Sequence, residues 1–396
     1  MNSILNQWSL TIWKIYAYEF LKGLHFFGAI LIPFFTEWGH LNYEQIFLLQ
    51  SWFLFWIFLL EIPTGSFADR FGRKYSLALG GILNALGALL YIAAPRFEVF
   101  LLAEFVWALS CAFTSGADEA ILYDTLKSEK KENQAKSAFS WKESIGLIAI
   151  GIGSTIGSLT IIPFGLTFPY FLTAGVLFLS GLLAITIKEP KIISKKQKPA
   201  LFTIMKEGLG YIRGHKTLQI LAFDMISLSV VSYFMIWLFQ PLIQNAGVSI
   251  AYFGLVHTGI IIAEVGLLAL YPRIEKKLGK KRKLLFYTSI LTGVFFIIAG
   301  ITTNIPLLLL AIFLGGGIGL TRRPILMAYM QHYIPSDKRA TIGSGISMLR
   351  TLSIAGANLI VGKLAEWNIP NTMIILGAAA IAFAMISKVE EEQLIG

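Results

Sequence analysis

The chain has 396 residues, of which 56% are apolar and 14% are charged, and its formal net charge is +10. A soluble globular domain has about 45–50% apolar residues and about a quarter charged residues. The composition therefore excludes a soluble domain, a disordered chain and a nucleic-acid-binding domain. The single cysteine, Cys111, also excludes a disulfide framework and a cysteine-based metal site.

Twelve apolar stretches are long enough to cross a membrane as helices, which takes about 20 largely apolar residues. They lie at residues 12–35, 43–64, 75–94, 98–122, 138–160, 168–187, 217–242, 250–271, 284–303, 306–330, 340–363 and 370–387. Residues 1–10 hold neither a basic cluster nor a small-residue cleavage site, so we expect the first span to be retained as an anchor. These features predict an all-α integral membrane protein with short loops.

The longest break between spans is 188–216, whose first half is a charged linker. After Pro199, the apolar residues Leu201, Ile204, Met205, Leu209 and Ile212 recur at helical spacing, which predicts a short interfacial helix. The break separates six spans from six. We therefore expect a bundle at 1–187, a cytoplasmic linker at 188–216 and a second bundle at 217–396.

Lysine and arginine are unevenly distributed between the loops on the two sides. Alternate loops, beginning with the one between the second and third spans, hold 25 of the 33 basic residues. The opposite loops hold Arg96, with Lys363 near the end of the eleventh span. Since basic loops stay in the cytoplasm, both termini are expected to be cytoplasmic.

The two halves align with each other. An offset of 207 places residues 45–51 on 252–258 and Gly72 on Gly279, and an offset of 204 places 118–119 on 322–323. Each half is therefore expected to be a six-helix unit, and the two units to be related by pseudo-symmetry. Paired repeats of this kind are how many secondary transporters achieve alternating access.

The loop between the second and third spans carries a motif, Gly65-Ser-Phe-Ala-Asp69-Arg70-Phe-Gly72-Arg73-Lys74. It resembles the GxxxD[RK]xGR[RK] signature of the major facilitator superfamily. Segments 61–64, 115–120 and 339–341 are also similar to that superfamily, so the resemblance covers essentially the whole chain. The second-half copy of the loop is degenerate, with Lys276 in place of Asp69.

The resemblance implies a conformational latch on the cytoplasmic side. Its residues are Gly65, Asp69, Arg70, Gly72, Arg73 and Asp124. Gly65 lets helices approach closely, and Asp69 is expected near the start of the eleventh span, where free N–H groups and the helix dipole favour an anion. Arg73 is expected to pair with Asp124. Alternatively, the basic residues of the loop only fix the topology.

Charges inside spans are costly and usually mark a pathway or a paired site. The resemblance implies that the first, fourth, seventh and tenth spans line the central cavity. Glu19 in the first span and Asp224 in the seventh are candidates for proton coupling, because a carboxyl group removed from water takes up a proton more readily. The alternative for Glu19 is an i, i+3 ion pair with Lys22, with His25 on the same side.

Asp118-Glu119 and Arg322-Arg323 occupy repeat-equivalent positions with opposite charge. They are expected to form a cytoplasmic gate of salt bridges between the halves. Alternatively, the arginines bind an anionic substrate through their planar donors, or each pair is solvated at its helix end. Glu104 is expected to share a helix face with Asp118. Secondary candidates are Glu143, His257, Glu264 and Arg350.

The sequence holds no phosphate-binding GxxxxGK[ST] loop, no HExxH and no cysteine cluster, so we expect neither an enzyme nor a cofactor or metal. The fifth span lacks the Gly-Pro signature that proton-coupled drug exporters of the superfamily often show, which weakens the case for export without excluding it. Its Gly153-x-x-x-Gly157 serves close packing. The fourth span also lacks the arginine common in many proton-coupled members of the superfamily.

We expect a proton-coupled secondary transporter for a small organic solute, with export of drug-like compounds slightly favoured. The alternatives are an uptake symporter for a nutrient or organic anion, a lipid or glycolipid flippase, and a transport-dead receptor. The expected partners are the solute, protons and membrane lipid. We expect a multi-pass monomer in a prokaryotic cytoplasmic membrane.

Overall fold

The chain is predominantly helical across residues 8–190, 201–335 and 338–395, which a computed structural model describes, and that part contains no strand. The N-terminal residues and the charged first half of the predicted linker lie outside the described residues. Within them, 10 helices are long and apolar enough to cross a membrane: Tyr43–Leu60, Phe97–Ser128, Glu132–Phe164, Phe168–Ile185, Lys216–Asn245, Ile250–Leu278, Lys281–Ile301, Ile305–Tyr333, Thr341–Trp367 and Ile369–Ile386. The prediction of an all-helical chain is confirmed for these residues, and the count of twelve spans stays a prediction.

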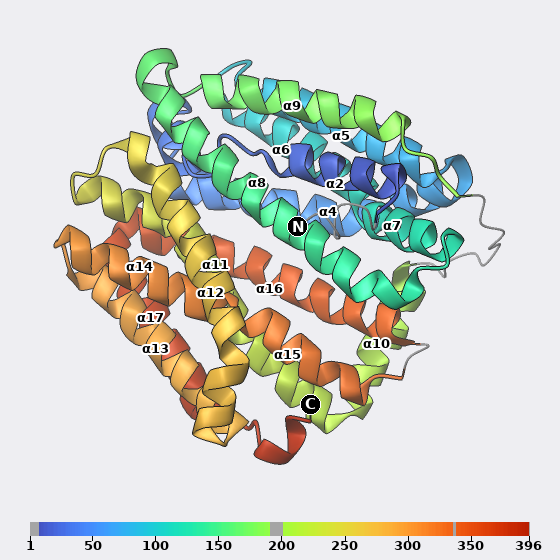
Figure 1. The fold of residues 1–396 in the computed structure, drawn as a ribbon. Coiled ribbons are helices and arrows are strands. Elements are labelled where there is room, and N and C mark those ends of the chain that lie inside the picture. The colour runs from blue at the N-terminus through green and yellow to red at the C-terminus, as the bar shows by residue number, and fades with distance from the viewer. Residues whose placement is uncertain (1–7, 191–200, 336–337, 396) are drawn as a thin grey trace. The chain divides into compact units, whose positions relative to one another are not determined.

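The chain divides into two compact units, Met1–Leu41 with Trp52–Lys198, and Asn42–Ser51 with Pro199–Gly396. The first unit contains α2 (Leu10–Gly23), α3 (Leu31–Pro33), the π-helix η1 (Phe34–Trp38), most of α4 (Tyr43–Phe71), α5 (Arg73–Tyr91), α6 (Phe97–Thr114), α7 (Ala117–Ser128), η2 (Glu132–Gln134), α8 (Ala135–Phe164) and α9 (Phe168–Ile185). Figure 1 colours these elements blue to green.

The second unit contains the start of α4 and the elements from α10 onward. These are α10 (Leu201–Gly214), α11 (Lys216–Asn245), η3 (Ile250–Tyr252), α12 (Phe253–Leu278), α13 (Lys281–Ile301), α14 (Ile305–Leu320), α15 (Arg322–Met330), η4 (Gln331–Tyr333), α16 (Arg339–Trp367), α17 (Ile369–Ile386) and η6 (Glu391–Gln393). The short helix predicted after Pro199 is α10.

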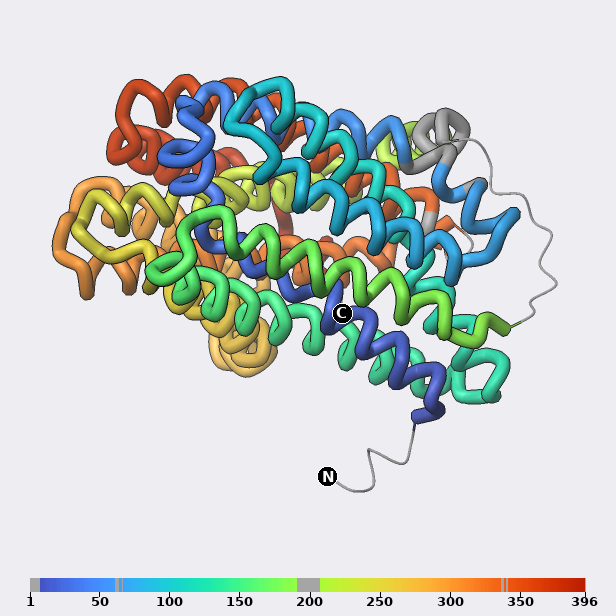
Figure 2. The backbone as a smooth tube through the Cα atoms, turned by 90° about the horizontal axis from the view of Figure 1, so that it is seen from above, coloured from blue at the N-terminus to red at the C-terminus, as the bar shows by residue number. Residues whose placement is uncertain are grey.

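The same helix pairs pack in both units. In the first unit α5 packs against α6 and α9, and in the second α13 packs against α14 and α17. Counted by span, α5 and α13 are the third helices of their units. Each packs against the fourth helix, α6 or α14, and against the sixth, α9 or α17. In the first unit α2 also packs against α8 and α9, and Figure 2 shows it running beside them.

The first predicted span is not one continuous helix. α2 ends at Gly23 after 14 residues, and the chain is irregular until α3. An irregular backbone at membrane depth must find its hydrogen bonds within the protein, and Phe26 N–H donates to Oγ1 of Thr173 at 3.1 Å. A Cβ at Gly157 would overlap the carbonyl oxygen of Phe26, so glycine in α8 gives the irregular segment room. The close packing predicted for this glycine motif is therefore present.

The fourth and tenth spans are also broken, although the sequence predicts each to be continuous. α6 ends at Thr114 and α7 begins at Ala117, after Gly116 in the left-handed region at φ +69°. α14 ends at Leu320 and α15 begins at Arg322. Both charged pairs, 118–119 and 322–323, therefore lie in the first turn of a new helix. The position of each break therefore determines where these candidate site residues lie in the fold.

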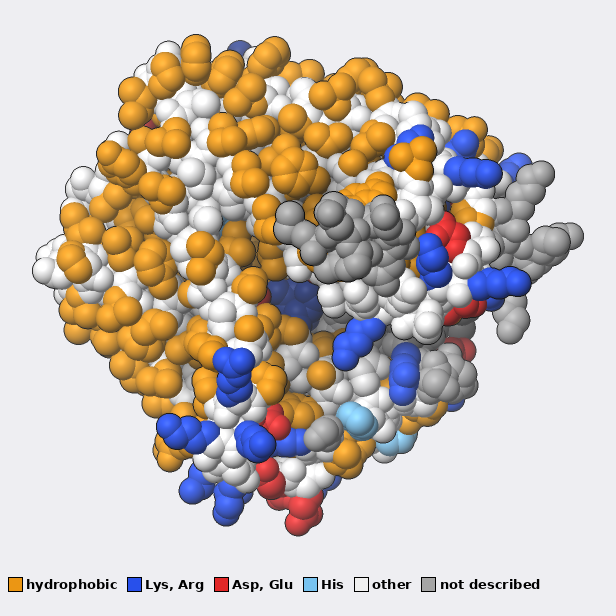
Figure 3. Space-filling view, viewed as in Figure 1, with side chains coloured by type: hydrophobic (Ala, Val, Ile, Leu, Met, Phe, Trp, Pro, Cys, Tyr) orange, Lys and Arg blue, Asp and Glu red, His pale blue; other side chains and the backbone are white. Residues whose placement is uncertain are grey.

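Apolar and basic side chains separate on the face of the second unit shown in Figure 3. Hydrophobic side chains cover α12 to α14, and basic side chains gather at the end where α12 and α13 meet. The exposed basic residues there are Arg273, Lys276, Lys277, Lys280, Arg282 and Lys283. An apolar surface with a basic end is typical of membrane helices.

Candidate functional site

Four charged side chains of the first unit meet between α2, α7 and α8. The Lys22 ammonium lies 3.0 Å from Oε2 of Glu19 and 2.9 Å from Oδ2 of Asp118. The Lys142 ammonium lies 3.1 Å from the same Asp118 oxygen and 3.8 Å from the same Glu19 oxygen. We call Glu19, Lys22, Asp118 and Lys142 the four-charge cluster. It carries two positive and two negative charges when all four are ionised, so its charge is balanced.

Three residues of the cluster are buried, and Lys22 is half-buried. Residue exposure is 9% for Glu19, 7% for Asp118 and 4% for Lys142. The i, i+3 ion pair between Glu19 and Lys22, which the sequence predicts as an alternative, is present as part of the four-charge cluster. The sequence counts Lys142, near the start of the predicted fifth span, among the basic residues that fix the topology, and its burial in this cluster was not predicted. Its neighbour Glu143 is exposed, with its carboxylate 3.9 Å from the Lys142 ammonium.

His25 lies in an aromatic cluster instead of joining the four charges. Its ring stacks on Phe27 at a centroid distance of 5.8 Å and meets the edge of Trp107 at 5.7 Å. Glu104 is buried and hydrogen-bonds with Tyr91. Because the helix is interrupted between α6 and α7, Glu104 and Asp118 do not belong to one helix face as predicted.

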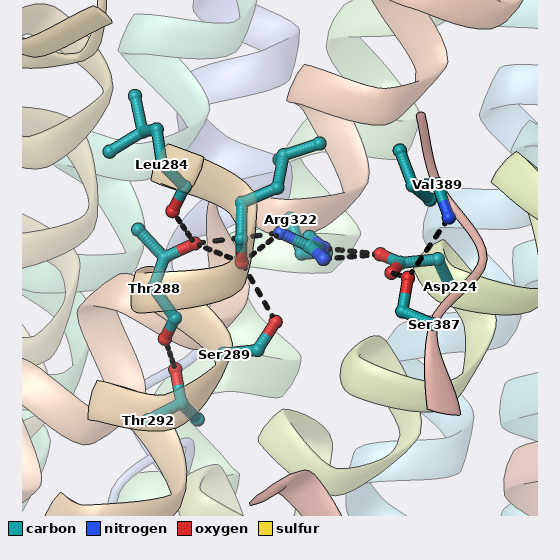
Figure 4. Close-up of polar contacts among 9 residues, drawn as sticks. Asp224, Leu284, Thr288, Ser289, Thr292, Arg322, Ser387 and Val389 are labelled. Atoms are coloured by element: carbon teal, nitrogen blue, oxygen red, sulfur yellow. Dashed lines mark hydrogen bonds and ion pairs between the residues drawn. The ribbon is translucent and has the colours of Figure 1, made fainter. Parts of the chain in front are cut away.

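The second unit contains a buried ion pair between Asp224 of α11 and Arg322 of α15 (Figure 4). Nε of Arg322 donates to Oδ1 of Asp224 at 2.7 Å, and Nη2 contacts the same oxygen. Nη1 donates to the carbonyl oxygen of Leu285 at 2.9 Å and to Oγ1 of Thr288 at 3.4 Å. Ser387 donates to the other Asp224 oxygen at 2.6 Å. The pair thus joins α11, α13, α15 and the end of α17.

The two buried sites occupy equivalent places in the repeat. Asp118 is the second residue of α7, which follows the break in the first unit's fourth span, and it contacts Lys22 of α2. Arg322 is the first residue of α15, which follows the break in the second unit's fourth span, and it contacts Asp224 of α11. The charges are inverted between the units. Each predicted gate residue that is buried is therefore paired within its own unit, whereas Glu119 and Arg323 are exposed. The gate between the halves stays a prediction.

The motif at residues 65–74 covers the last turns of α4, Gly72 and the start of α5. Arg73 and Asp124 form the ion pair that the family resemblance implies, while Asp69 and Arg70 are exposed. Sequence reasoning missed Glu189, whose carboxylate accepts the N–H groups of Arg73 and Lys74 at 2.9 and 3.2 Å. These are unsatisfied donors of a helix N-terminus, where an anion is favoured.

An equivalent contact exists in the second unit. Glu391 accepts the N–H groups of Lys281 and Arg282 at 2.7 and 2.8 Å, at the start of α13. In both units an acidic residue soon after the sixth helix caps the third. The sequence signal for these two caps is an acidic residue that recurs a few positions after the sixth and the twelfth predicted spans.

The remaining candidates are dispersed. His257 stacks on Phe239 at 6.0 Å, which supports a packing role. Glu264 is half-buried on α12. Arg350 is half-buried on α16, and its Nε is buried without a hydrogen-bond partner among the described residues.

Comparison with known proteins gives a consistent family. The model described as Major Facilitator Superfamily matches residues 23–358. The glucose/galactose transporter of Brucella abortus is 26% identical over 246 residues, which cover 57% of this chain and 58% of that protein. Multidrug resistance protein 1 of Bacillus subtilis is 22% identical over 311 residues, which cover 76% of this chain and 75% of that protein. The chain thus spans less than two thirds of the Brucella relative.

Solved structures share the fold. The nucleoside transporter NupG has a TM-score of 0.77 at 13% identity, covering 96% of this chain and 100% of that one. A POT family transporter in complex with 5-aminolevulinic acid has a TM-score of 0.73 at 14% identity, covering 97% and 96%. At these identities the likeness concerns the fold alone.

Proposed function

The chain belongs to the Major Facilitator Superfamily, and from this premise we propose a proton-coupled secondary transporter of a small organic solute. In this proposal α2 with η1, and α5, complete twelve membrane-crossing helices whose termini both lie in the cytoplasm. Transport across the membrane, the proton coupling and the solute are all parts of this proposal.

The observation that carries the proposal is the position of Asp118 between two ammonium groups, at 2.9 and 3.1 Å. A proton bound to Asp118 or Glu19 would leave the four-charge cluster with one excess positive charge. Because charge inside the membrane protein is costly without a partner, protonation would weaken the link between α2, α7 and α8. Release of the proton on the other side would restore the balance and the link.

Asp224 is less suited to carry the proton. Its two oxygens are held by Arg322 and Ser387, and protonation would leave a buried guanidinium without a counter-charge. We therefore assign coupling to Glu19 and Asp118, and a fixed structural joint to the Asp224–Arg322 pair.

The direction of transport is proposed from the relatives. Export of drug-like compounds is favoured by similarity to a multidrug resistance protein over 76% of the chain. Uptake is the alternative, supported by similarity to a glucose/galactose transporter over 57%.

The test is solute flux in proteoliposomes with and without an imposed pH gradient, using ethidium, glucose and uridine as probes. We expect the gradient to drive accumulation or efflux of at least one probe. Asp118→Asn should abolish movement of the probe that is driven by the pH gradient. Exchange of the same probe between the two sides of the membrane at equal pH should continue. Flux that is independent of the gradient for every transported probe would refute the coupling.

A matched control is Glu129→Gln, which also removes one carboxylate charge. Glu129 pairs with Lys131 at 3.2 Å, and both side chains are partly exposed, at 22% and 31%. This variant should keep gradient-driven flux. Equal loss in both variants would show that the effect of Asp118→Asn is not specific to the four-charge cluster.

A further inference from the structure

We infer that a cavity between α11, α16 and α17 binds one acyl chain of an anionic phospholipid, whose headgroup is held by Arg213 and Lys216. All of the residues concerned belong to the second unit. The inference goes beyond the proposed transport function, because it assigns a lipid site whose lining includes neither Asp224 nor Arg322.

The cavity is apolar. Its volume is about 460 Å³, which lies within the range of about 300–1,000 Å³ for ligand sites. Phe223 of α11 and Phe383 of α17 form part of the lining, with their rings edge to face at a centroid distance of 6.2 Å. The hydroxyl of Ser353, on the α16 side, donates to the carbonyl oxygen of Leu349 at 2.8 Å and is thus already satisfied. No charged side chain of the described residues lines the cavity, so its surface suits a hydrocarbon chain.

The cavity follows one half of a membrane span. Its lining on α11 extends from Gln219 to Val230, which is about 16.5 Å at 1.5 Å per residue. One leaflet contributes about half of a hydrocarbon core that is about 30 Å thick. The span that contains α11 begins at Lys216, so the cavity starts close to the boundary between membrane and water. Its length and depth therefore match an acyl chain of one leaflet.

The cavity is also open at the surface of the second unit. Phe223 is 49% exposed, and Gln219 and Ser353 are exposed as well. Leu352, beside Ser353 on α16, is 43% exposed. Exposed apolar side chains on a membrane-spanning helix contact lipid, so an acyl chain can enter the cavity sideways from the bilayer.

Basic side chains lie at the end of the cavity where α10 meets α11. The side-chain amide of Gln219 donates to the carbonyl oxygens of Ile212 and Arg213 at 3.2 and 2.6 Å. Ile212 and Gln219 both line the cavity, so the backbone of Arg213 lies directly beside the lining. The side chains of Arg213 and Lys216 are exposed. An acyl chain in the cavity would thus place its headgroup next to two cations.

A third cation lies on the same side of α10. The Lys338 ammonium lies 5.7 Å from the centre of the Tyr211 ring, one residue before Ile212. Guanidinium and ammonium groups bind phosphate oxygens, and each basic residue near a membrane surface raises the affinity for an anionic lipid about fivefold. A zwitterionic headgroup has no net charge to gain from this arrangement. The charges therefore select an anionic phospholipid.

The test titrates the purified chain in detergent with phosphatidylglycerol or phosphatidylcholine that carry the same palmitoyl and oleoyl chains, and native mass spectrometry measures the first bound lipid. We expect phosphatidylglycerol to bind at least about tenfold more tightly. Arg213→Gln and Lys216→Gln should each reduce this preference about fivefold. Arg282→Gln removes the same charge from an exposed position on α13 and should leave the preference unchanged.

A second pair of variants tests the cavity itself. Ser353→Phe fills it from α16 and should weaken both lipids at least about tenfold. Ser144 of α8 is also exposed and donates to the carbonyl oxygen four residues earlier at the same 2.8 Å, so Ser144→Phe makes the same change elsewhere and should keep lipid binding. Ser353→Leu fills less space and should have a smaller effect in the same direction, which keeps the test valid if the larger ring disturbs folding.

Several results would overturn the inference. These are equal affinity for the two lipids, a preference that survives the loss of both Arg213 and Lys216, and equal lipid binding by the wild type and both Ser353 variants. Displacement of phosphatidylglycerol by ethidium, glucose or uridine would assign the cavity to a solute and would overturn it too. The assay measures no flux, so its failure leaves the proposed transport function standing.

Discussion

Removing the charge of Asp118 should strongly destabilise the first unit, and removing Lys142 as well should restore much of the loss. Asp118→Asn leaves the ammonium groups of Lys22 and Lys142 facing Glu19 alone. Lys142→Gln leaves two carboxylates facing Lys22. The double variant leaves the balanced Glu19–Lys22 pair, whose atoms lie 3.0 Å apart.

The magnitude follows from the distances. Two unit charges 3 Å apart attract by about 5 kcal/mol at an effective dielectric constant near 20, and Asp118 has two such partners, at 2.9 and 3.1 Å. Desolvation opposes this attraction by several kcal/mol for each ion. Breaking a buried pair on one side costs about 3–5 kcal/mol, and we expect that cost for each single variant. The double variant should cost at least about 2 kcal/mol less than the sum.

The assay is reversible unfolding in mixed detergent micelles, monitored by circular dichroism, for the wild type, both single variants and the double variant. Glu129→Gln is the control, because its ion pair with Lys131 is partly exposed to solvent and such a surface pair contributes about 0–1 kcal/mol. Two results would refute the reasoning: a cost for Asp118→Asn no greater than the control's, or single costs that add up in the double variant.

Two further predictions concern the second unit and the motif loop. Asp224→Asn leaves Arg322 buried without a counter-charge and should lower the free energy of unfolding by about 3–5 kcal/mol. Ser387→Ala removes only one hydrogen bond and should lower it by about 1–2 kcal/mol. Equal losses for the two variants in the same unfolding assay would contradict the ion-pair role. Asp69→Asn should abolish solute flux in proteoliposomes without changing expression or unfolding temperature, because Asp69 is exposed and is proposed to act in the latch; normal flux would exclude the latch.

The membrane helices could be predicted because a run of about 20 apolar residues is a local signal. The Glu19–Lys22 pair was likewise within reach, since residues three apart on a helix are neighbours. The ion pair of Arg73 and Asp124 was implied by the family motif. All of these depend on short spacing or on a known pattern.

The burial of Lys142 could not be predicted in the same way. In the sequence it follows Lys130, Lys131 and Lys136 and has the same local appearance as a solvated loop lysine. Its partner Asp118 lies 24 residues earlier, across the η2 turn, and only the packing of α7 on α8 brings the two together. The break after Gly23 was missed for a similar reason, because the acceptor that makes it tolerable, Thr173, lies in α9.

The repeat itself explains why the two buried sites differ in what they can do. Both units contain a contact between the first helix and the restarted fourth helix, but the charges are inverted. In the second unit one guanidinium and one carboxylate are held by fixed hydrogen bonds, so no group can change its protonation without leaving a buried charge unpaired. In the first unit each ammonium contacts both carboxylates. When one carboxylate takes a proton, both lysines still have the other as a partner. In the first unit, unlike the second, protonation leaves each cation with a carboxylate partner, and that difference is the physical ground for proposing the coupling site there.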